Sequence, residues 1–225
     1  MIAVEASDGG GTSSIQEYDV PYVQPTTFQE LDKLISALAT DTTFGAVILD
    51  NATDMVSRLV KPHALTFPTR GAPPPTRSIG VPCRDDYQIM GELVRKTFNG
   101  LINLTKLPNA LARKHLLVTV LEKEKQDDGT IVAYCPDLPG QMAETASAMF
   151  ELYAGIKIAN VVKPDPTNPK ATIKEQVRLF TTKGDGRKQL GDRYKVFPEE
   201  GPLDFVQLFE QYWLPKVAAT TALTA

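Results

Sequence analysis

The sequence predicts an α/β domain with a mostly parallel sheet, flanking helices, and antiparallel strands toward its C-terminal side. Short continuous apolar runs at residues 1–5, 44–49 and 115–120 are typical of strands in a parallel sheet. Segments with apolar residues at helical spacing alternate with these runs, and two strand-like stretches follow at 152–162 and 176–182. This alternation indicates one domain over residues 1–214, followed by a flexible tail at 215–225.

The first half of the chain is organised around one glycine loop and one buried strand. Residues 1–5 predict a strand that stops at the loop Asp8-Gly9-Gly10-Gly11. Residues 27–38 predict a helix with Thr26 or Thr27 as its N-cap. The run 44–49 predicts a strand closed by Asp50, and residues 52–60 predict a second helix.

Residues 61–84 contain six prolines, a density at which we expect a Pro-rich inserted loop without regular structure. Beyond it we expect a helix over 85–104, a buried strand over 115–120 and a charged turn over 123–129. A β-arm at 131–134 and helices at 140–151 and 204–213 complete the set.

Composition excludes several classes of protein. The net charge of −3 provides no global basic field, so contacts with DNA would have to come from local basic loops. The two cysteines lack metal-ligand spacing and are read as reduced thiols, with a disulfide as the alternative. There is no long apolar run and no N-terminal signal region, so we expect a cytoplasmic protein without a membrane span.

The best local signal for chemistry is the apolar run that ends in Asp50. A buried parallel strand fixes a terminal carboxylate at the edge of the sheet where Mg²⁺ and phosphates bind in open α/β folds. This pattern is typical of a Walker B strand. The alternative is that Asp50 only caps the helix that follows the strand.

The order of the motifs carries a resemblance to a known family. After the Asp50 strand come the strand 114–123, the motif Pro136-Asp137-Leu138-Pro139-Gly140 with its helix, and Gly191-Asp192-Arg193. This succession resembles the phage AAA/RecA-like P-loop nucleotide-binding proteins over about residues 1–209. That family includes recombination ATPases that act beside single-strand annealing proteins.

The resemblance implies a RecA-like P-loop NTPase core that uses ATP and Mg²⁺. It also implies a phage protein in a bacterial host, acting as a homo-oligomer on single-stranded DNA. Its partner would be a single-strand annealing or single-strand-binding protein.

By the same resemblance, Asp50 would hold Mg²⁺ through water beside Asn51. Asp8, or in second place Glu5, would polarise the attacking water. The alternative for Asp8 is a loop cap.

Three further residues take roles from the resemblance. The strand that ends at Val120-Leu121-Glu122 would be the sensor strand of the family, and Glu122 would be its terminal acidic residue. Arg193 would reach the phosphates of a neighbouring subunit, and Lys188 would stand in for a lysine that relatives carry nearby. The alternative for Arg193 is a surface ion pair with Asp192 or Glu199.

Two loops are predicted to face DNA, with solvated loops as the alternative. Local cations with a stacking aromatic can bind single strands despite an acidic total charge. The cations are Arg70, Arg77 and Arg84 in the loop 61–84, and Lys123 and Lys125 in the loop 123–135, which ends near Tyr134.

The phosphate-binding loop of this family is missing. No Gly-x-x-x-x-Gly-Lys-Ser/Thr string occurs, and Gly9-Gly10-Gly11 has no following lysine. We expect either a reading frame that starts late or a degenerate relative, such as an inactive binding or scaffold subunit. Without the first strand of the family, one edge of residues 115–120 should lack a partner strand. An unrelated hydrolase or transferase is a third class, but no Gly-x-Ser-x-Gly elbow supports it.

Overall fold

The computed structural model describes residues 2–5, 20–67, 82–165, 168–184, 187–188 and 190–215. The fold is mixed α/β, with one parallel sheet and several antiparallel ones, as predicted. The chain divides into two compact units, unit 1 over 1–123 and 135–146, and unit 2 over 124–134 and 147–225. The prediction of one domain over 1–214 stays a prediction.

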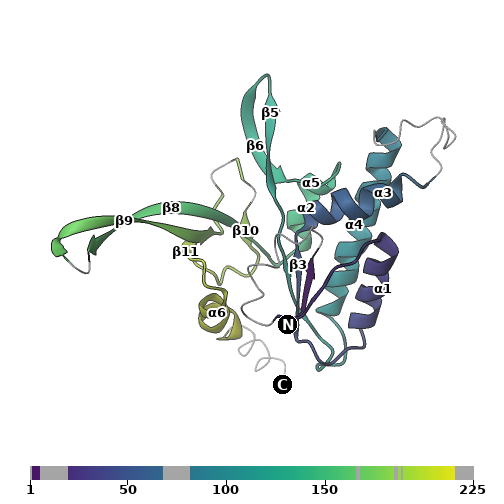
Figure 1. The fold of residues 1–225 in the computed structure, drawn as a ribbon, viewed down its shortest axis with the longest axis horizontal. Helices are drawn as coiled ribbons and strands as arrows, with labels where there is room; N and C mark the ends of the chain where they lie inside the picture. Colours follow the sequence, from purple (N-terminus) through teal and green to yellow (C-terminus); the bar gives the residue numbers. More distant parts are fainter. Residues whose placement is uncertain are drawn as a thin grey trace. The chain divides into compact units, whose positions relative to one another are not determined.

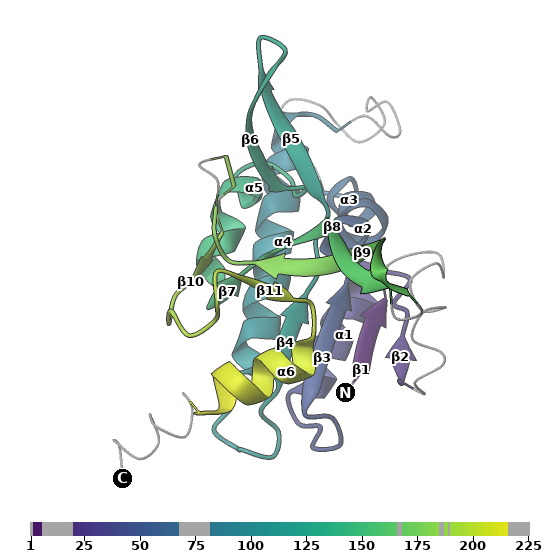
Figure 2. The ribbon, with the colours of Figure 1, turned by 90° about the vertical axis from the view of Figure 1, so that its left-hand side faces the viewer.

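Unit 1 is built on a four-stranded parallel sheet in the order β2-β1-β3-β4 (Figure 2). Its strands are β1 (Ile2–Glu5), β2 (Tyr22–Val23), β3 (Ala46–Asp50) and β4 (His115–Val118). The predicted strand at 1–5 is confirmed as the buried β1, and the one at 44–49 as β3, which begins at Ala46 and in which Val47 and Leu49 are buried. The two-residue strand β2 had no sequence signal.

Strand β4 was predicted as buried over 115–120, but it ends at Val118 and its side chains are half-buried or exposed. Within the described residues β4 pairs only with β3, through bonds such as His115 N to Gly45 O at 2.9 Å and Thr119 N to Leu49 O at 3.0 Å. Alternate residues of a strand direct their backbone N–H and C=O groups to opposite edges. The N–H and C=O groups of Leu116 and Val118 therefore point to the edge of β4 that lies away from β3. Among the described strands, β4 is therefore an edge strand of the sheet, as expected.

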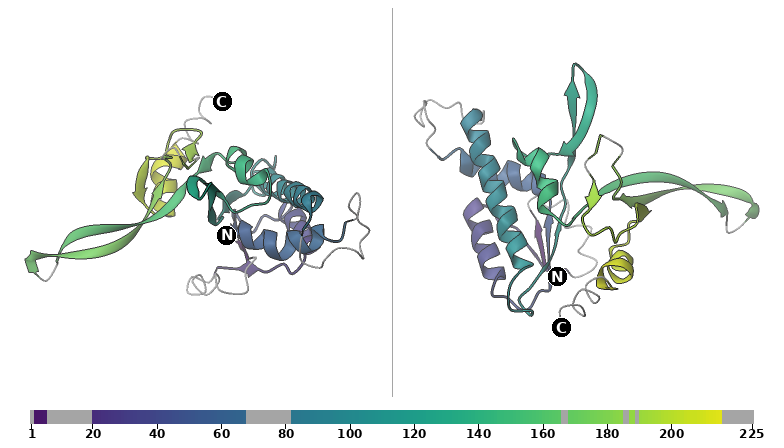
Figure 3. Two further views of the ribbon diagram at one scale, coloured as in Figure 1. Left: turned by 90° about the horizontal axis from the view of Figure 1, so that it is seen from above. Right: turned by 180° about the vertical axis from the view of Figure 1, so that it is seen from behind.

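Two helices cover one face of this sheet, α1 (Phe28–Leu38) and α4 (Arg84–Leu104) (Figure 3). The predicted cap of α1 is confirmed, since the Thr27 hydroxyl accepts the Glu30 N–H at 3.2 Å. Leu31, Val94 and Phe98 are at most 1 % exposed and form the core between the helices and the sheet. The helical periodicity of both segments therefore indicated the correct buried face.

The helical segment after β3 is longer than predicted. It runs through α2 (Ala52–Met55), the π-helical turn η3 (Val56–Val60) and α3 (Lys61–Ala64). The expectation that no regular structure occurs over 61–84 is wrong at both ends, where α3 and the start of α4 lie. Pro62 stands at the second position of α3, directly after the π-helical turn η3.

The predicted charged turn over 123–129 is instead a strand. The strands β5 (Glu122–Asp127) and β6 (Thr130–Pro136) form a hairpin, and only Asp128 and Gly129 make the turn. Both turn residues have positive φ, 46° and 75°, which is the requirement of a two-residue hairpin turn. The charges of β5 concealed the strand because β5 is exposed on both faces.

The segment after Gly140 is helical but short, with α5 (Met142–Thr145) followed by the 3-10 turn η5 (Ala146–Met149). Cys83 and Cys135 form no disulfide. None of the helices in the described part of the chain is both long and apolar enough to cross a membrane.

Unit 2 is dominated by antiparallel strands. The long strands β8 (Gly155–Asp165) and β9 (Asn168–Thr181) pair as a ribbon, and β11 (Glu200–Pro202) joins the base of β9 (Figure 1). A second small sheet contains β7 (Leu152–Tyr153) and β10 (Gly191–Asp192). The predicted C-terminal helix is present as α6 (Phe205–Leu208) and the π-helical turn η6 (Phe209–Trp213).

Candidate functional site at the strand ends of unit 1

Two acidic residues stand next to each other at the carboxyl ends of adjacent parallel strands. Glu5 ends β1, Asp50 ends β3, and the sheet register pairs them directly. Glu5 is only 2 % exposed, whereas Asp50 is half-buried. Paired residues on parallel strands point to the same face of the sheet, so both carboxylates belong to one site. The sequence identified both residues, with Glu5 second to Asp8.

A third strand adds a hydroxyl group to this site. The Thr119 Oγ1 donates to Asp50 Oδ1 at 2.5 Å, from the residue directly after β4. A neutral donor on the carboxylate orients Asp50 without neutralising it. The sequence interpretation missed Thr119; the available signal was a polar residue immediately after the apolar run His115–Val118.

Asn51, not Asp50, caps the helix that follows β3. The Asn51 side chain accepts the Asp54 N–H at 2.8 Å and donates to Asp54 Oδ2 at 2.9 Å. The alternative role of Asp50 as the N-cap is therefore wrong. Because Asn51 fills that role, the Asp50 carboxylate is available for another one. The peptide bond between the two residues is cis.

The Pro-Asp-Leu-Pro-Gly motif is held beside the same strand ends. The Thr53 Oγ1 donates to the Asp137 carbonyl at 3.2 Å and accepts the Leu121 N–H at 3.1 Å. Asp137 N in turn donates to the Leu121 carbonyl at 2.8 Å. Lys123 Nζ lies 3.0 Å from Asp137 Oδ1. The motif identified in the sequence is thus hydrogen-bonded to Thr53, in the helix that directly follows the Asp50 strand.

The other predicted catalytic residues that the structure describes, Glu122 and Arg193, lie on other elements. Glu122 begins β5 instead of ending the preceding strand. Arg193, in unit 2, donates from Nη2 to the Ala148 carbonyl at 2.8 Å. The alternative ion pairs of Arg193 are not among the described contacts, since Asp192 accepts backbone N–H groups and Glu199 pairs with Lys183. The role of Arg193 in reaching the phosphates of a neighbouring subunit stays a prediction.

The remaining predicted binding residues divide into described and undescribed ones. Lys188 Nζ lies 4.8 Å from the centre of the Tyr134 ring, which is a cation–π distance. Arg84 is exposed at the start of α4, and Lys125 is exposed on β5. Asp8, Arg70 and Arg77 lie outside the described residues.

The oxygen atoms of the strand-end site suit a hard cation. Mg²⁺ is usually bound through one or two carboxylates while it keeps several waters and takes phosphate oxygens. Glu5 and Asp50 supply such carboxylates. Among the described residues, no group of three or more His, Cys, Asp and Glu side chains could enclose a metal alone. The site therefore fits a metal that arrives with a phosphate ligand better than a closed metal centre.

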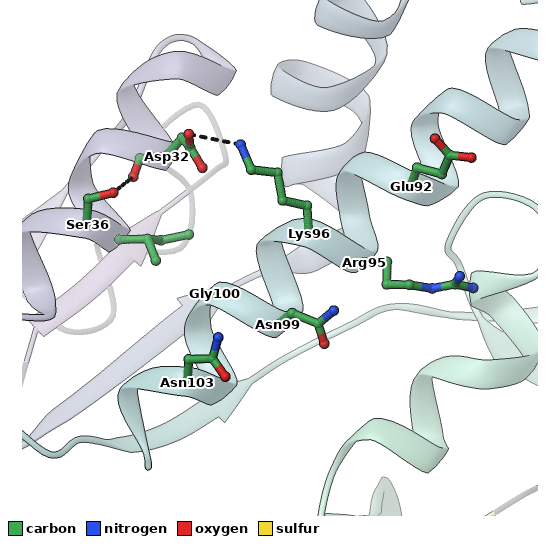
Figure 4. A pocket seen from close by; sticks show the side chains of 9 residues that line it. Asp32, Ser36, Glu92, Arg95, Lys96, Asn99, Gly100 and Asn103 are labelled. Atoms are coloured by element: carbon green, nitrogen blue, oxygen red, sulfur yellow. Dashed lines mark hydrogen bonds and ion pairs between the residues drawn. The ribbon is translucent and has the colours of Figure 1, made fainter. Parts of the chain in front are cut away.

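A hollow on unit 1 lies elsewhere, between α1 and α4 (Figure 4). Lys96 donates to Asp32 Oδ2 at 3.0 Å across it, and both side chains are about half-exposed. The rest of the lining mixes acidic, basic and amide groups, namely Glu92, Arg95, Asn99 and Asn103. This mixture selects no ligand chemistry, so the strand ends remain the candidate site.

Comparison with known proteins leaves the family open: no family model matches the chain, and no curated protein sequence matches it significantly.

Proposed function

We propose that this chain is a RecA-like nucleotide-binding protein of phage DNA recombination, replication or repair. It would bind Mg²⁺ and ATP phosphates at the ends of β1, β3 and β4, and act on single-stranded DNA. The observation that carries the proposal is the pairing of Glu5 with Asp50 at the carboxyl ends of adjacent parallel strands. Ligands of open α/β sheets bind at this edge.

Each residue of the site has a role that its surroundings support. Asp50, oriented by the Thr119 hydroxyl, would hold Mg²⁺ through water. Glu5, on the neighbouring strand, would orient a water toward the terminal phosphate. When bound, the metal would neutralise charge on the phosphates. In the family that the sequence resembles, the strand carrying the phosphate loop lies next to the sensor strand, at the edge that β4 leaves without a partner among the described strands.

A second candidate function is a catalytically inactive binding or scaffold subunit of the same fold. The observation in its favour is that the sequence contains no Gly-x-x-x-x-Gly-Lys-Ser/Thr string and therefore lacks the lysine of that string. That lysine would stabilise the charge that develops on the phosphates, so its loss removes turnover more severely than binding. We therefore expect nucleotide binding by residues 1–225 without measurable ATP hydrolysis.

The test is calorimetric titration of the chain with MgATP, with Asp50→Asn compared against Asp32→Asn. Loss of a group that holds the metal through water should weaken binding about 10–100-fold. Asp32→Asn removes the same charge from the distant α1 surface, where Asp32 pairs with Lys96, and should leave binding unchanged. Equal binding by wild type and Asp50→Asn would remove the site from consideration. Phosphate release that Asp50→Ala abolishes would reject the inactive alternative.

A further inference from the structure

Most of the β8–β9 ribbon of unit 2 consists of two strands only. The ladder runs from Gly155 paired with Thr181 to Pro164 paired with Thr172. The third strand, β11, pairs only with residues 179–181 of β9 (Figure 1). An isolated two-stranded ribbon is at best marginally stable in water, and it gains stability when another surface covers one of its faces.

One face of this ribbon combines aliphatic and cationic side chains. Ile156, Ile158 and Val162 are 57 %, 67 % and 59 % exposed. The register places Ile158 beside Arg178 and Val162 beside Lys174, and paired residues share a face. We call Ile156, Ile158, Val162, Lys174 and Arg178 the ribbon face. On the opposite face, Ala159 and Val177 are half-buried, whereas Lys157, Ile173 and Glu175 are exposed.

The charge of the ribbon is opposite in sign to that of the whole chain. Residues 155–181 contain five basic and two acidic residues, a net charge of +3, in a chain of net charge −3. The described ion pairs of unit 2 join Lys157 to Glu200 and Lys183 to Glu199, so they leave Lys174 and Arg178 for another anion. A partner that suits this face therefore carries regular negative charges beside apolar groups.

We propose that the ribbon face binds single-stranded DNA. This inference rests on the DNA-handling part of the proposed function and gives that function a location. Lys174 and Arg178 contact phosphates, while the three aliphatic side chains cover the faces of unpaired bases. A duplex hides its base faces by stacking, so the aliphatic part of the surface favours a single strand.

The β5–β6 hairpin, which the sequence had suggested for this role, fits less well. Residues 122–136 contain two lysines and four acidic residues, a net charge of −2. One of these lysines, Lys123, is already paired with Asp137. Since the phosphate backbone supplies most of the sequence-independent affinity, the cationic ribbon is the better candidate.

The experiment measures fluorescence anisotropy of labelled oligothymidylate, about 30 nucleotides long, as a function of salt. Each lost phosphate contact lowers the slope of log K against log salt by about 0.7 for a single strand. Lys174→Ala/Arg178→Ala should therefore lower the magnitude of the slope by about 1.4. Ile158→Ser/Val162→Ser should weaken binding severalfold and leave the slope unchanged, because it removes apolar contacts only.

Lys106→Ala/Lys183→Ala provides the matched control, since it removes two exposed lysines outside the ribbon. If the wild type binds and the ribbon variants bind with its affinity and slope, the ribbon face is not the site, while DNA binding itself stands. A slope change in Lys123→Ala/Lys125→Ala alone would assign the site to the β5–β6 hairpin. Absence of DNA binding by the wild type would overturn both the inference and the DNA part of the proposed function. The nucleotide-binding part would still be decided by the MgATP titration alone.

Two further measurements complete the test. A matching duplex should bind more weakly than the single strand, and stronger duplex binding would contradict the role of the aliphatic groups. Sedimentation velocity separates DNA from a second copy of the chain as occupant. If Ile158→Ser/Val162→Ser converts an oligomer to a monomer and leaves DNA binding unchanged, the face is a self-association surface and the inference is wrong.

Discussion

In unit 1 the central strands β1 and β3 carry the buried side chains of the sheet, whereas in unit 2 the longest strands are largely open to solvent. Val47 and Leu49 on β3 are 0 % and 1 % exposed, but Ile158 and Val162 on β8 are 67 % and 59 % exposed. Burial of apolar area is the main favourable term in folding, so unit 1 obtains its stability from its core. The contrast teaches that strand length does not indicate strand burial in this chain.

Unit 2 depends more on local polar and aromatic contacts. The Asp192 carboxylate accepts the N–H groups of Tyr194, Val196 and Phe197 at 2.9, 2.5 and 2.7 Å. Phe197 also stacks on Trp213, with ring centres 6.2 Å apart. A carboxylate that satisfies several backbone donors organises a loop without a large apolar core. Such an arrangement suits a unit that carries an exposed ribbon.

The largest expected effect tests the difference in burial directly. Leu49→Ala should destabilise unit 1 by about 2–5 kcal/mol, because it leaves a cavity in the core. Ile158→Ala should change stability by less than about 0.5 kcal/mol, since its side chain is already exposed. Urea unfolding of Leu49→Ala is followed by far-UV circular dichroism, which reports unit 1, where α1 and α4 lie. Urea unfolding of Ile158→Ala is followed by the fluorescence of Trp213, the single tryptophan, which lies in unit 2. A comparable loss in Ile158→Ala would show that the ribbon is packed.

An intermediate effect is expected from the loop of unit 2. Asp192→Ala leaves three backbone donors without their acceptor and should cost about 1–3 kcal/mol. The fluorescence of Trp213, the single tryptophan, reports this unit because its ring stacks on Phe197. Asp127→Ala, on the exposed strand β5, is the control and should shift the transition by less than about 0.5 kcal/mol. If both variants melt alike, the loop contacts do not stabilise unit 2.

The smallest expected effect is a dependence of stability on pH that has opposite directions in the two units. The N–H of Phe44 donates to Asp41 in unit 1 and lowers the pKa of that carboxyl below its usual 3.8. The stability that the ionised Asp41 carboxyl contributes to the fold is therefore present above pH 3.8 and is lost as the pH falls through the lowered pKa. In unit 2 the hydrogen bond to Glu199 raises the pKa of Lys183 above its usual 10.5. The stability that the protonated Lys183 contributes is therefore lost only as the pH rises through the raised pKa.

Thermal melts of Asp41→Asn and Lys183→Met against wild type check these signs. The deficit of Asp41→Asn should disappear at the acidic end, and that of Lys183→Met at the alkaline end. The deficit of Lys183→Met should be small and reduced by salt, because Lys183 is exposed. That of Asp41→Asn should be less sensitive to salt, because the Asp41 side chain is only 30 % exposed and pairs with the buried Lys114. A deficit of Asp41→Asn that grows toward acid would contradict the direction of its pKa.

Much of unit 1 was predictable from residue order alone. The apolar runs that became β1 and β3, the Thr27 cap and the buried faces of α1 and α4 follow from local rules of periodicity and capping. Asp50 could be identified because a carboxylate directly follows a buried run. The short strands β2, β10 and β11 could not, because two or three residues carry no period. Strand β5 was hidden because it is charged and exposed on both faces, whereas its partner β6 includes the β-arm predicted at 131–134.

By itself, then, the sequence determined the α/β class, the elements with a clear apolar period, and the acidic residues at the ends of β1 and β3. Only the tertiary structure decided that Glu5 and Asp50 are neighbours, that Thr119 joins them, and that Asn51 is the helix cap. The physical reason is that strand order and register come from contacts between residues distant in the chain, which no local pattern contains. The same holds for the ribbon face, whose aliphatic and cationic halves lie on two strands and meet only through their pairing.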